Sequence, residues 1–188
     1  MHMSPVTSPS TSLPGPVCGT LPVTLSLHRG SEAGRSVLMD HYARLDAETL
    51  RARFYCPISG SAALRMAARS RPDVVIALSL GTTVRGVCEV YRLSDGRGEM
   101  ALSTEQGFQG CGFGRQLFEA GCSAAQEAGF PSLVIHAARD RHAILHMLRK
   151  AGATMNTHSD GVTAHLTLSR SGPPESPCAP MAHRSAHL

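Results

Sequence analysis

The sequence predicts an α+β fold, with a mixed, mostly antiparallel twisted sheet of six to seven strands flanked by about four helices. Two observations indicate this fold. Three strand patterns follow one another through short turns between residues 74 and 104, as in an antiparallel meander. The third of these strands leads through a glycine-rich turn into a long helix and a further strand, which indicates a crossover connection. With 188 residues, the chain is long enough to bury one full core.

The first elements of the domain are one strand and three helices. Residues 23–27 alternate between apolar and polar, which predicts a strand, and apolar residues at helical spacing predict a helix over residues 35–44. Asp46 predicts the start of a second helix, because its carboxylate can accept hydrogen bonds from the unpaired N–H groups of a first turn. A third helix, rich in Ala and Arg, is expected over residues 61–70 and ends before Pro72.

The meander supplies the next three strands. Residues 74–80 are apolar except for Ser79, which indicates a buried strand. Residues 84–92 alternate between the two faces of a sheet, and the turn signal at residues 94–96 predicts a hairpin. The third strand, over residues 99–104, leads directly to the glycine-rich turn.

The C-terminal part of the domain continues the crossover. We expect a helix over residues 115–129, a strand over 132–137, a helix over 141–151 and a last strand over 162–168. The residues expected on the buried face of the first of these helices are Leu117, Phe118, Gly121, Ala124, Ala125 and Ala128.

Both ends of the chain are rich in Ser, Thr and Pro, and such stretches bury too little apolar surface to become ordered. We therefore expect disordered tails at residues 1–20 and 170–188, around one domain at residues 21–169. The sequence shows neither a signal peptide nor an apolar run of about 20 residues. A cytoplasmic protein without a membrane partner is the expectation that follows.

The cysteines and the charges exclude further classes of site. The six cysteines form no CxxC and no zinc spacing, and His142 and His146 lack a third ligand, so we expect no metal. The net charge is +4, and all but one of the 18 basic residues are arginines, the exception being Lys150. Because the arginines are scattered and not interleaved with aromatic residues, we expect no nucleic-acid partner.

Residues 109–114 read Gln-Gly-Cys-Gly-Phe-Gly and stand directly before the long helix. Glycines let a ligand approach the backbone, and a helix N-terminus offers unpaired N–H groups with a partial positive charge, so this turn predicts a phosphate site. A dinucleotide fingerprint would need glycine where Arg115 stands, and no Gly-Lys pair of a nucleotide P-loop occurs. A nucleotide-binding domain is therefore the weakest of the alternatives.

The same turn resembles the pyrophosphate loop of the GNAT acetyltransferases, whose motif is Gln/Arg-x-x-Gly-x-Gly/Ala. Gln109, Gly112 and Gly114 match this motif position by position. The order of strands and helices over about residues 23–168 also follows the family. The resemblance implies a GNAT-like sheet and acetyl-CoA as cosubstrate.

The resemblance further implies which residues bind acetyl-CoA. In the family the pyrophosphate is held by backbone N–H groups of the loop, and the pantetheine arm pairs with the backbone of the preceding strand. The corresponding residues here are Leu102, Ser103, Thr104, Gln109, Gly110, Cys111, Gly112, Phe113, Gly114 and Arg115.

Acetylation of an amine needs a base, because a free amine must attack the thioester. Glu99, on the strand that leads to the loop, is the candidate, although a one-residue shift in register would turn it away. Glu89 is the fallback base, and the backbone N–H of Leu102 or a neighbour is the expected oxyanion donor. The family's usual acid is a Tyr on the last helix, at a position that Leu148 occupies here.

The function we predict is direct transfer of acetyl from acetyl-CoA to a primary amine, on a small molecule or on a protein lysine or N-terminus. The alternative is a non-catalytic acyl-CoA-binding module, since the missing Tyr is also consistent with lost chemistry. A homodimer is left open as the assembly.

Overall fold

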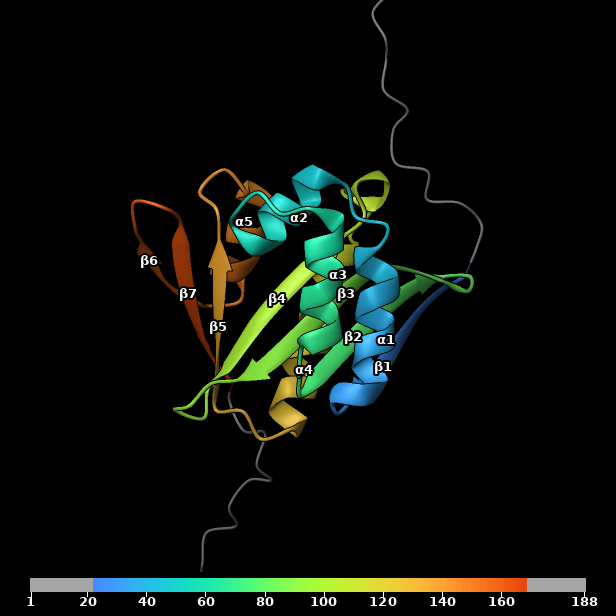
Figure 1. The fold of residues 1–188 in the computed structure, drawn as a ribbon. Helices are drawn as coiled ribbons and strands as arrows, with labels where there is room; N and C mark the ends of the chain where they lie inside the picture. The colour runs from blue at the N-terminus through green and yellow to red at the C-terminus, as the bar shows by residue number, and fades with distance from the viewer. Residues whose placement is uncertain (1–21, 169–188) are drawn as a thin grey trace, which may run out of the picture.

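The computed structural model describes residues 22–168, which form a seven-stranded sheet in the order β1-β2-β3-β4-β5-β7-β6 with helices on both faces (Figure 1). The strands are β1 (Val23–Arg29), β2 (Val74–Leu80), β3 (Thr83–Arg92), β4 (Gly98–Thr104), β5 (Ser132–Ala137), β6 (Thr154–Thr157) and β7 (Val162–Thr167). The helices are α1 (Ser31–Tyr42), α2 (Ala47–Phe54), α3 (Gly60–Arg69), the 3₁₀ helix η1 (Gln106–Phe108), α4 (Phe113–Glu127) and α5 (His142–Lys150).

The predicted α+β class is confirmed. Every strand pair is antiparallel except β4–β5, which is the parallel pair that the crossover requires. The described residues form five α-helices, where the sequence predicted about four. The expected tails, residues 1–20 and 170–188, lie outside the described residues.

One strand was missed, and several element ends differ from the sequence prediction, most of all the first helix, which was expected over residues 35–44 and runs from Ser31 to Tyr42. The edge strand β6 was not predicted, because it has four residues of which only Met155 is partly buried, so it carries almost no alternating pattern. Helix α4 begins at Phe113 and not at residue 115, since Gly112 adopts φ 80° and forms its N-cap. The last two residues of the glycine motif therefore belong to the first turn of the helix.

Helix α4 covers one face of the sheet and packs on β2, β3 and β4. Its buried residues are Phe113, Leu117, Phe118, Gly121, Ala124 and Ala125. The predicted apolar face is thus confirmed, while Ala128 follows the helix and is half-buried. A Cβ on Gly121 would lie 2.5 Å from Cys88 Sγ and 2.9 Å from Met100 Cε, so the helix approaches the sheet as closely as glycine permits.

Helices α1, α2 and α3 cover the opposite face (Figure 1). A second core joins them to the sheet through Leu38, Leu50, Ala63, Val75 and Val87. Neighbouring strand residues Ile76 and Cys88 point to the α4 side instead. Strands β2 and β3 are therefore buried on both faces, which explains why residues 74–80 are apolar except for Ser79.

The parallel pair β4–β5 separates after three residue pairs. Gly98, Glu99 and Met100 pair with Leu133, Val134 and Ile135, and no pairing follows along the remaining lengths of the two strands. Figure 1 shows β5 diverging from β4 towards the end of the sheet where α2 lies. The facing backbone edges of β4 and β5 beyond this point are left without a strand partner.

We expect Gly121→Ala to lower the free energy of unfolding by about 1 kcal/mol. Helix propensity alone favours Ala over Gly by about 1 kcal/mol, but overpacking a filled core costs about 1–3 kcal/mol. Urea unfolding of the variant measures the balance. Ser123→Ala, at an exposed position of the same helix, is the control and should not destabilise. A more stable Gly121→Ala protein would contradict the close approach of α4 to β3 and β4.

Candidate active site

A cavity of about 1030 Å³ lies where β4 and β5 separate. Its walls come from α2, β4, the glycine-rich turn, the start of α4, β5 and α5. A second cavity of about 670 Å³ adjoins it on the side of the β6–β7 turn. The residues that line both cavities are Ala52, Tyr55, His136, Ala137, Ala138, Asp140 and Arg141. The two cavities therefore meet at the ends of α2 and β5.

Most of the predicted site residues line the larger cavity. They are Glu99, Leu102, Ser103, Thr104, Gln109, Gly110, Gly112, Gly114 and Arg115. Cys111 and Phe113 do not line it. Phe113 is buried in the α4 core and stacks on Phe108, and Cys111 packs against the same core. Only the backbone groups of these two residues remain for a ligand.

The glycine-rich turn leaves open space at the start of α4. Gly110 and Gly112 adopt φ values of 78° and 80°, the left-handed region that favours glycine. A Cβ built on Gly110, Gly112 or Gly114 would meet nothing within 4 Å. Gln109 Nε2 donates a hydrogen bond to the Thr104 carbonyl at 3.2 Å, which ties the turn to the end of β4. The unpaired N–H groups of the first turn of α4 thus border a space that an anion can occupy.

Glu99 points towards α2 and not towards α4. The register pairs Glu99 with Tyr91, and directly paired residues share a face of the sheet. The Tyr91 hydroxyl donates to Glu89, which also contacts α1 and α2. Glu99 therefore lines the cavity from the face that α2 covers, without the one-residue shift in register that would turn it away.

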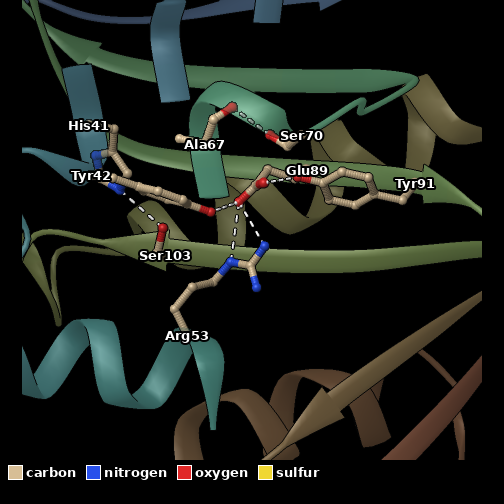
Figure 2. Close-up of polar contacts among 8 residues, drawn as sticks. All are labelled: His41, Tyr42, Arg53, Ala67, Ser70, Glu89, Tyr91 and Ser103. Atoms are coloured by element: carbon tan, nitrogen blue, oxygen red, sulfur yellow. Dashed lines mark hydrogen bonds and ion pairs between the residues drawn. The ribbon is translucent and has the colours of Figure 1, made fainter. Parts of the chain in front are cut away.

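Glu89 lies outside the cavity, in a buried hydrogen-bond network (Figure 2). Its carboxylate accepts hydrogen bonds from the Tyr42 and Tyr91 hydroxyls and from Arg53 Nε at 3.2 Å and Nη2 at 3.0 Å. The Glu89 and Arg53 side chains are only 1% and 14% exposed. With all these donors engaged, the carboxylate has no access to a substrate amine, so the fallback base is a structural residue.

This network also determines the protonation states of the three side chains that contact Glu89. Burial and the neighbouring Glu89 carboxylate raise the pKa values of Tyr42 and Tyr91 well above the usual range, so both phenols stay protonated as donors. Although burial opposes it, the Glu89 carboxylate raises the pKa of Arg53. The ion pair joins the last turn of α2 to β3 and holds α2 over the cavity.

A second buried contact reaches the cavity through Ser103. His41 Nε2 lies 3.0 Å from Ser103 Oγ, and His41 Nδ1 has no hydrogen-bond partner among the described residues (Figure 2). Burial, with Arg44 and Arg53 nearby, lowers the pKa of His41 to about 3. The imidazole is therefore neutral at pH 7, and it fixes the hydroxyl of a residue in the cavity wall.

Tyr55 lines both cavities and was not among the predicted site residues. Tyr55 follows α2 with φ 56°, the one positive value for a residue other than glycine among residues 22–168. Leu148, at the position where the family usually carries Tyr, is fully buried in the α4 core and not in the cavity. The signal that could have found Tyr55 is its place at a helix end before Cys56-Pro57, where the chain must turn.

Helix α5 forms the remaining wall, which His142, His146 and Lys150 line. Within residues 22–168, no group of three His, Cys, Asp or Glu side chains could hold a metal ion. In the same described segment, no helix is long and apolar enough to cross a membrane.

Comparisons with known proteins point to one family. The model of the "Acetyltransferase (GNAT) family" matches residues 41–153. No curated protein gives a significant match to the sequence. Among solved structures, the GNAT domain of S. lividans PAT has a TM-score of 0.60 and 17% identity, covering 76% of this chain and 89% of that one.

Two further structures share the fold over nearly their whole length. Ribosomal-protein-S18-alanine N-acetyltransferase from Escherichia coli has a TM-score of 0.57 and 13% identity, covering 80% of this chain and 98% of its own. The putative acetyltransferase yncA from Salmonella typhimurium, solved with its cofactor acetyl-CoA, has a TM-score of 0.54 and 14% identity, covering 82% and 99%. At these identities the likeness concerns the fold.

The buried His41 should make the protein less stable in mild acid. Below pH 6.5 the unfolded imidazole binds a proton that the folded one, with a pKa of about 3, does not bind. Stability therefore falls as the pH drops, by about 2 kcal/mol from pH 7 to pH 5 for this one group. Urea unfolding at both pH values, compared with His41→Gln, isolates its share from the other titrating groups. Equal pH dependence of the two proteins would contradict a neutral His41.

Proposed function

The chain belongs to the acetyltransferase (GNAT) family, and on this premise we propose that it transfers acetyl from acetyl-CoA directly to a primary amine. The observation that carries the proposal is the separation of β4 from β5 beside an open glycine turn. An unpaired strand edge, a turn with exposed N–H groups and a helix N-terminus follow one another along a single cavity. This order suits the pantetheine arm and the pyrophosphate of one extended molecule.

In this proposal the pantetheine arm pairs with the backbone of Leu102, Ser103 and Thr104. The pyrophosphate accepts hydrogen bonds from backbone N–H groups of residues 109–115. Arg115 contributes positive charge at the same helix end, although Glu119 shares it through an ion pair of 2.7 Å. The open space over Gly110, Gly112 and Gly114 supports a ligand that lies directly on the backbone.

Glu99 is the proposed base. It takes a proton from the incoming ammonium group, directly or through water, and the free amine then attacks the thioester carbon. The backbone N–H of Leu102 or a neighbour stabilises the oxyanion. The acceptor enters through the second cavity, on the face of the sheet that Glu99 shares with His136 and α2. Its class, a small molecule or a protein lysine or N-terminus, belongs to the proposal, as do a homodimer and a cytoplasmic location.

Leu148 stands where the family usually carries Tyr, and this difference favours one alternative, a non-catalytic acyl-CoA-binding module. Both functions require acetyl-CoA binding, and only the enzyme releases free CoA thiol when an amine is present. A protein that only binds acyl-CoA needs no base, whereas Glu99 lines the cavity where a base would act.

Acetyl-CoA should stabilise the protein against heat. At 100 times its dissociation constant a ligand adds about 2.7 kcal/mol, which corresponds to about 5–10 °C in Tm for a chain of this size. Gly114→Glu should abolish the shift, because its carboxylate would occupy the open space and repel the pyrophosphate. Gly114 has no positive φ and no close neighbour, so the substitution spares the fold.

The control is Gly60→Glu, which places the same side chain in open space at the start of α3. This variant should keep the full acetyl-CoA shift. No shift of the wild-type protein at millimolar acetyl-CoA would refute both the enzyme and the binding module, and a shift by ATP or NAD alone would favour a nucleotide-binding domain.

Glu99→Gln should lower kcat by about 100-fold or more, the usual contribution of a general base, while leaving acetyl-CoA binding intact. Release of CoA thiol is measured with a peptide N-terminus, a lysine peptide and a small polyamine as acceptors. Glu119→Gln, which removes another carboxylate of the cavity wall on α4, is the matched control. Unchanged turnover in Glu99→Gln would remove Glu99 from the mechanism.

A further inference from the structure

The reaction proposed above needs a proton at the leaving sulfur, and the last helix carries no Tyr to supply it. His142 and His146 of that helix line the larger cavity but not the smaller one. Leu148 is fully buried in the α4 core, where even a phenol would face core side chains. The chain contains three tyrosines, and the hydroxyls of Tyr42 and Tyr91 are both engaged by Glu89. Tyr55 is the third, and its hydroxyl makes no hydrogen bond to any residue within 22–168.

Tyr55 stands where donor and acceptor must meet. The acetyl donor occupies the larger cavity and the amine arrives through the smaller one, so the thioester lies where the two cavities join. Among the residues that line both, only Tyr55, His136, Asp140 and Arg141 have ionisable side chains. Arg141 forms ion pairs with Glu48 at 3.5 Å and Asp140 at 4.0 Å, which removes Arg141 and Asp140 from the candidates.

His136 and Tyr55 then remain. His136 lies on β5, and its Nδ1 is 3.2 Å from Thr163 Oγ1, so its ring is held towards β7. Tyr55 follows α2, and it lines the larger cavity together with Glu99. Its left-handed backbone, φ 56°, turns the chain at this point, and such conformations gather at functional sites.

We propose that Tyr55 is a catalytic residue of this chain: its hydroxyl donates the proton to the sulfur of the departing CoA. This assignment rests on the acetyl transfer proposed above. The acid of this chain then lies at the end of α2, on the other face of the sheet from the last helix, where the family usually carries it.

The protons and electrons of the step balance. The amine nitrogen bonds to the carbonyl carbon, the carbon–sulfur bond breaks, and its electron pair stays on sulfur. Glu99 passes the first proton of the ammonium group to solvent, and it takes a second proton from the same nitrogen once that nitrogen has bonded to carbon. Tyr55 Oη–H gives its proton to the sulfur, and Glu99 returns this second proton to the phenolate. The products are the amide and CoA thiol, with both side chains restored. Burial and Glu99 raise the pKa of Tyr55 to about 12, so the phenol holds its proton until the thiolate forms.

The buried Glu89–Arg53 pair positions this phenol. Arg53 lies two residues before Tyr55, and its hydrogen bonds of 3.0 and 3.2 Å to Glu89 hold the last turn of α2 on β3. Without that pair the end of α2 would be attached only through the apolar contacts of Leu50 and Phe54. The position of Tyr55 over the separated strands depends on this ion pair.

The first experiment compares binding of CoA and desulfo-CoA, which differ only in the thiol, at about pH 9.5, above the ordinary thiol pKa. A hydrogen bond from Tyr55 to the thiolate should favour CoA about tenfold or more in the wild-type protein. Tyr55→Phe should lose this preference and His136→Gln should keep it. Equal preference in wild type and Tyr55→Phe, or its loss in His136→Gln alone, would overturn the proposal.

The second experiment measures turnover, with the amine that gives the fastest release of CoA thiol. Tyr55→Phe should lower kcat about 100-fold at an unchanged dissociation constant for acetyl-CoA. Difluorotyrosine at position 55, a more acidic phenol, should restore activity. Because this phenol loses its proton at lower pH than Tyr does, kcat should begin to fall at a lower pH than in the wild-type protein. A Tyr55→Phe enzyme with wild-type kcat would refute the proton transfer.

The two experiments also separate this proposal from the proposed function. If no amine supports turnover, the enzymatic function fails, and the preference for CoA over desulfo-CoA still decides whether Tyr55 contacts the sulfur. If turnover is normal and that preference is independent of Tyr55, only the assignment of Tyr55 fails.

Discussion

The site depends on one buried carboxylate. Glu89 lies on β3 in the middle of the sheet, and it is tolerated there because Tyr42, Tyr91 and Arg53 direct hydrogen bonds to it. These donors come from α1, β3 and α2, so satisfying the carboxylate fixes two helices on the sheet (Figure 2). Removing Arg53 would leave the Glu89 charge buried and without its ion-pair partner, which costs about 3–5 kcal/mol. The position of α2 as a cavity wall therefore depends on the hydrogen bonds that the Glu89 carboxylate accepts.

The sequence allowed accurate prediction where the information is local. The buried strand β2 and the Asp46 cap, which accepts from Thr49 N at 2.8 Å, are both confirmed. The family and the glycine turn were predicted for the same reason, because the short motif at residues 109–114 indicates both. The edge strand β6 was missed because its four residues form a strand only beside β7.

The contacts that sequence reasoning missed join residues far apart in the chain. Arg53 is one of the scattered arginines of the sequence, and no residue near it in the chain indicates a contact with Glu89, 36 residues away. The role proposed for Tyr55 likewise depends on β4 and β5, which line the same cavity. Glu99 lines the larger cavity, and its orientation follows from the register of β3 and β4 and not from its own neighbours.

The brief contact between β4 and β5 has a mechanical consequence. Three residue pairs at one end join a unit of β1 to β4 to a unit of β5, β6 and β7. The backbone hydrogen bonds of the sheet are thus interrupted along a seam that coincides with the larger cavity. A molecule that pairs with the free edge of β4 closes part of this seam and ties the two halves together. Under the proposed function, bound acetyl-CoA would replace part of the missing strand pairing and make the sheet more rigid along this seam.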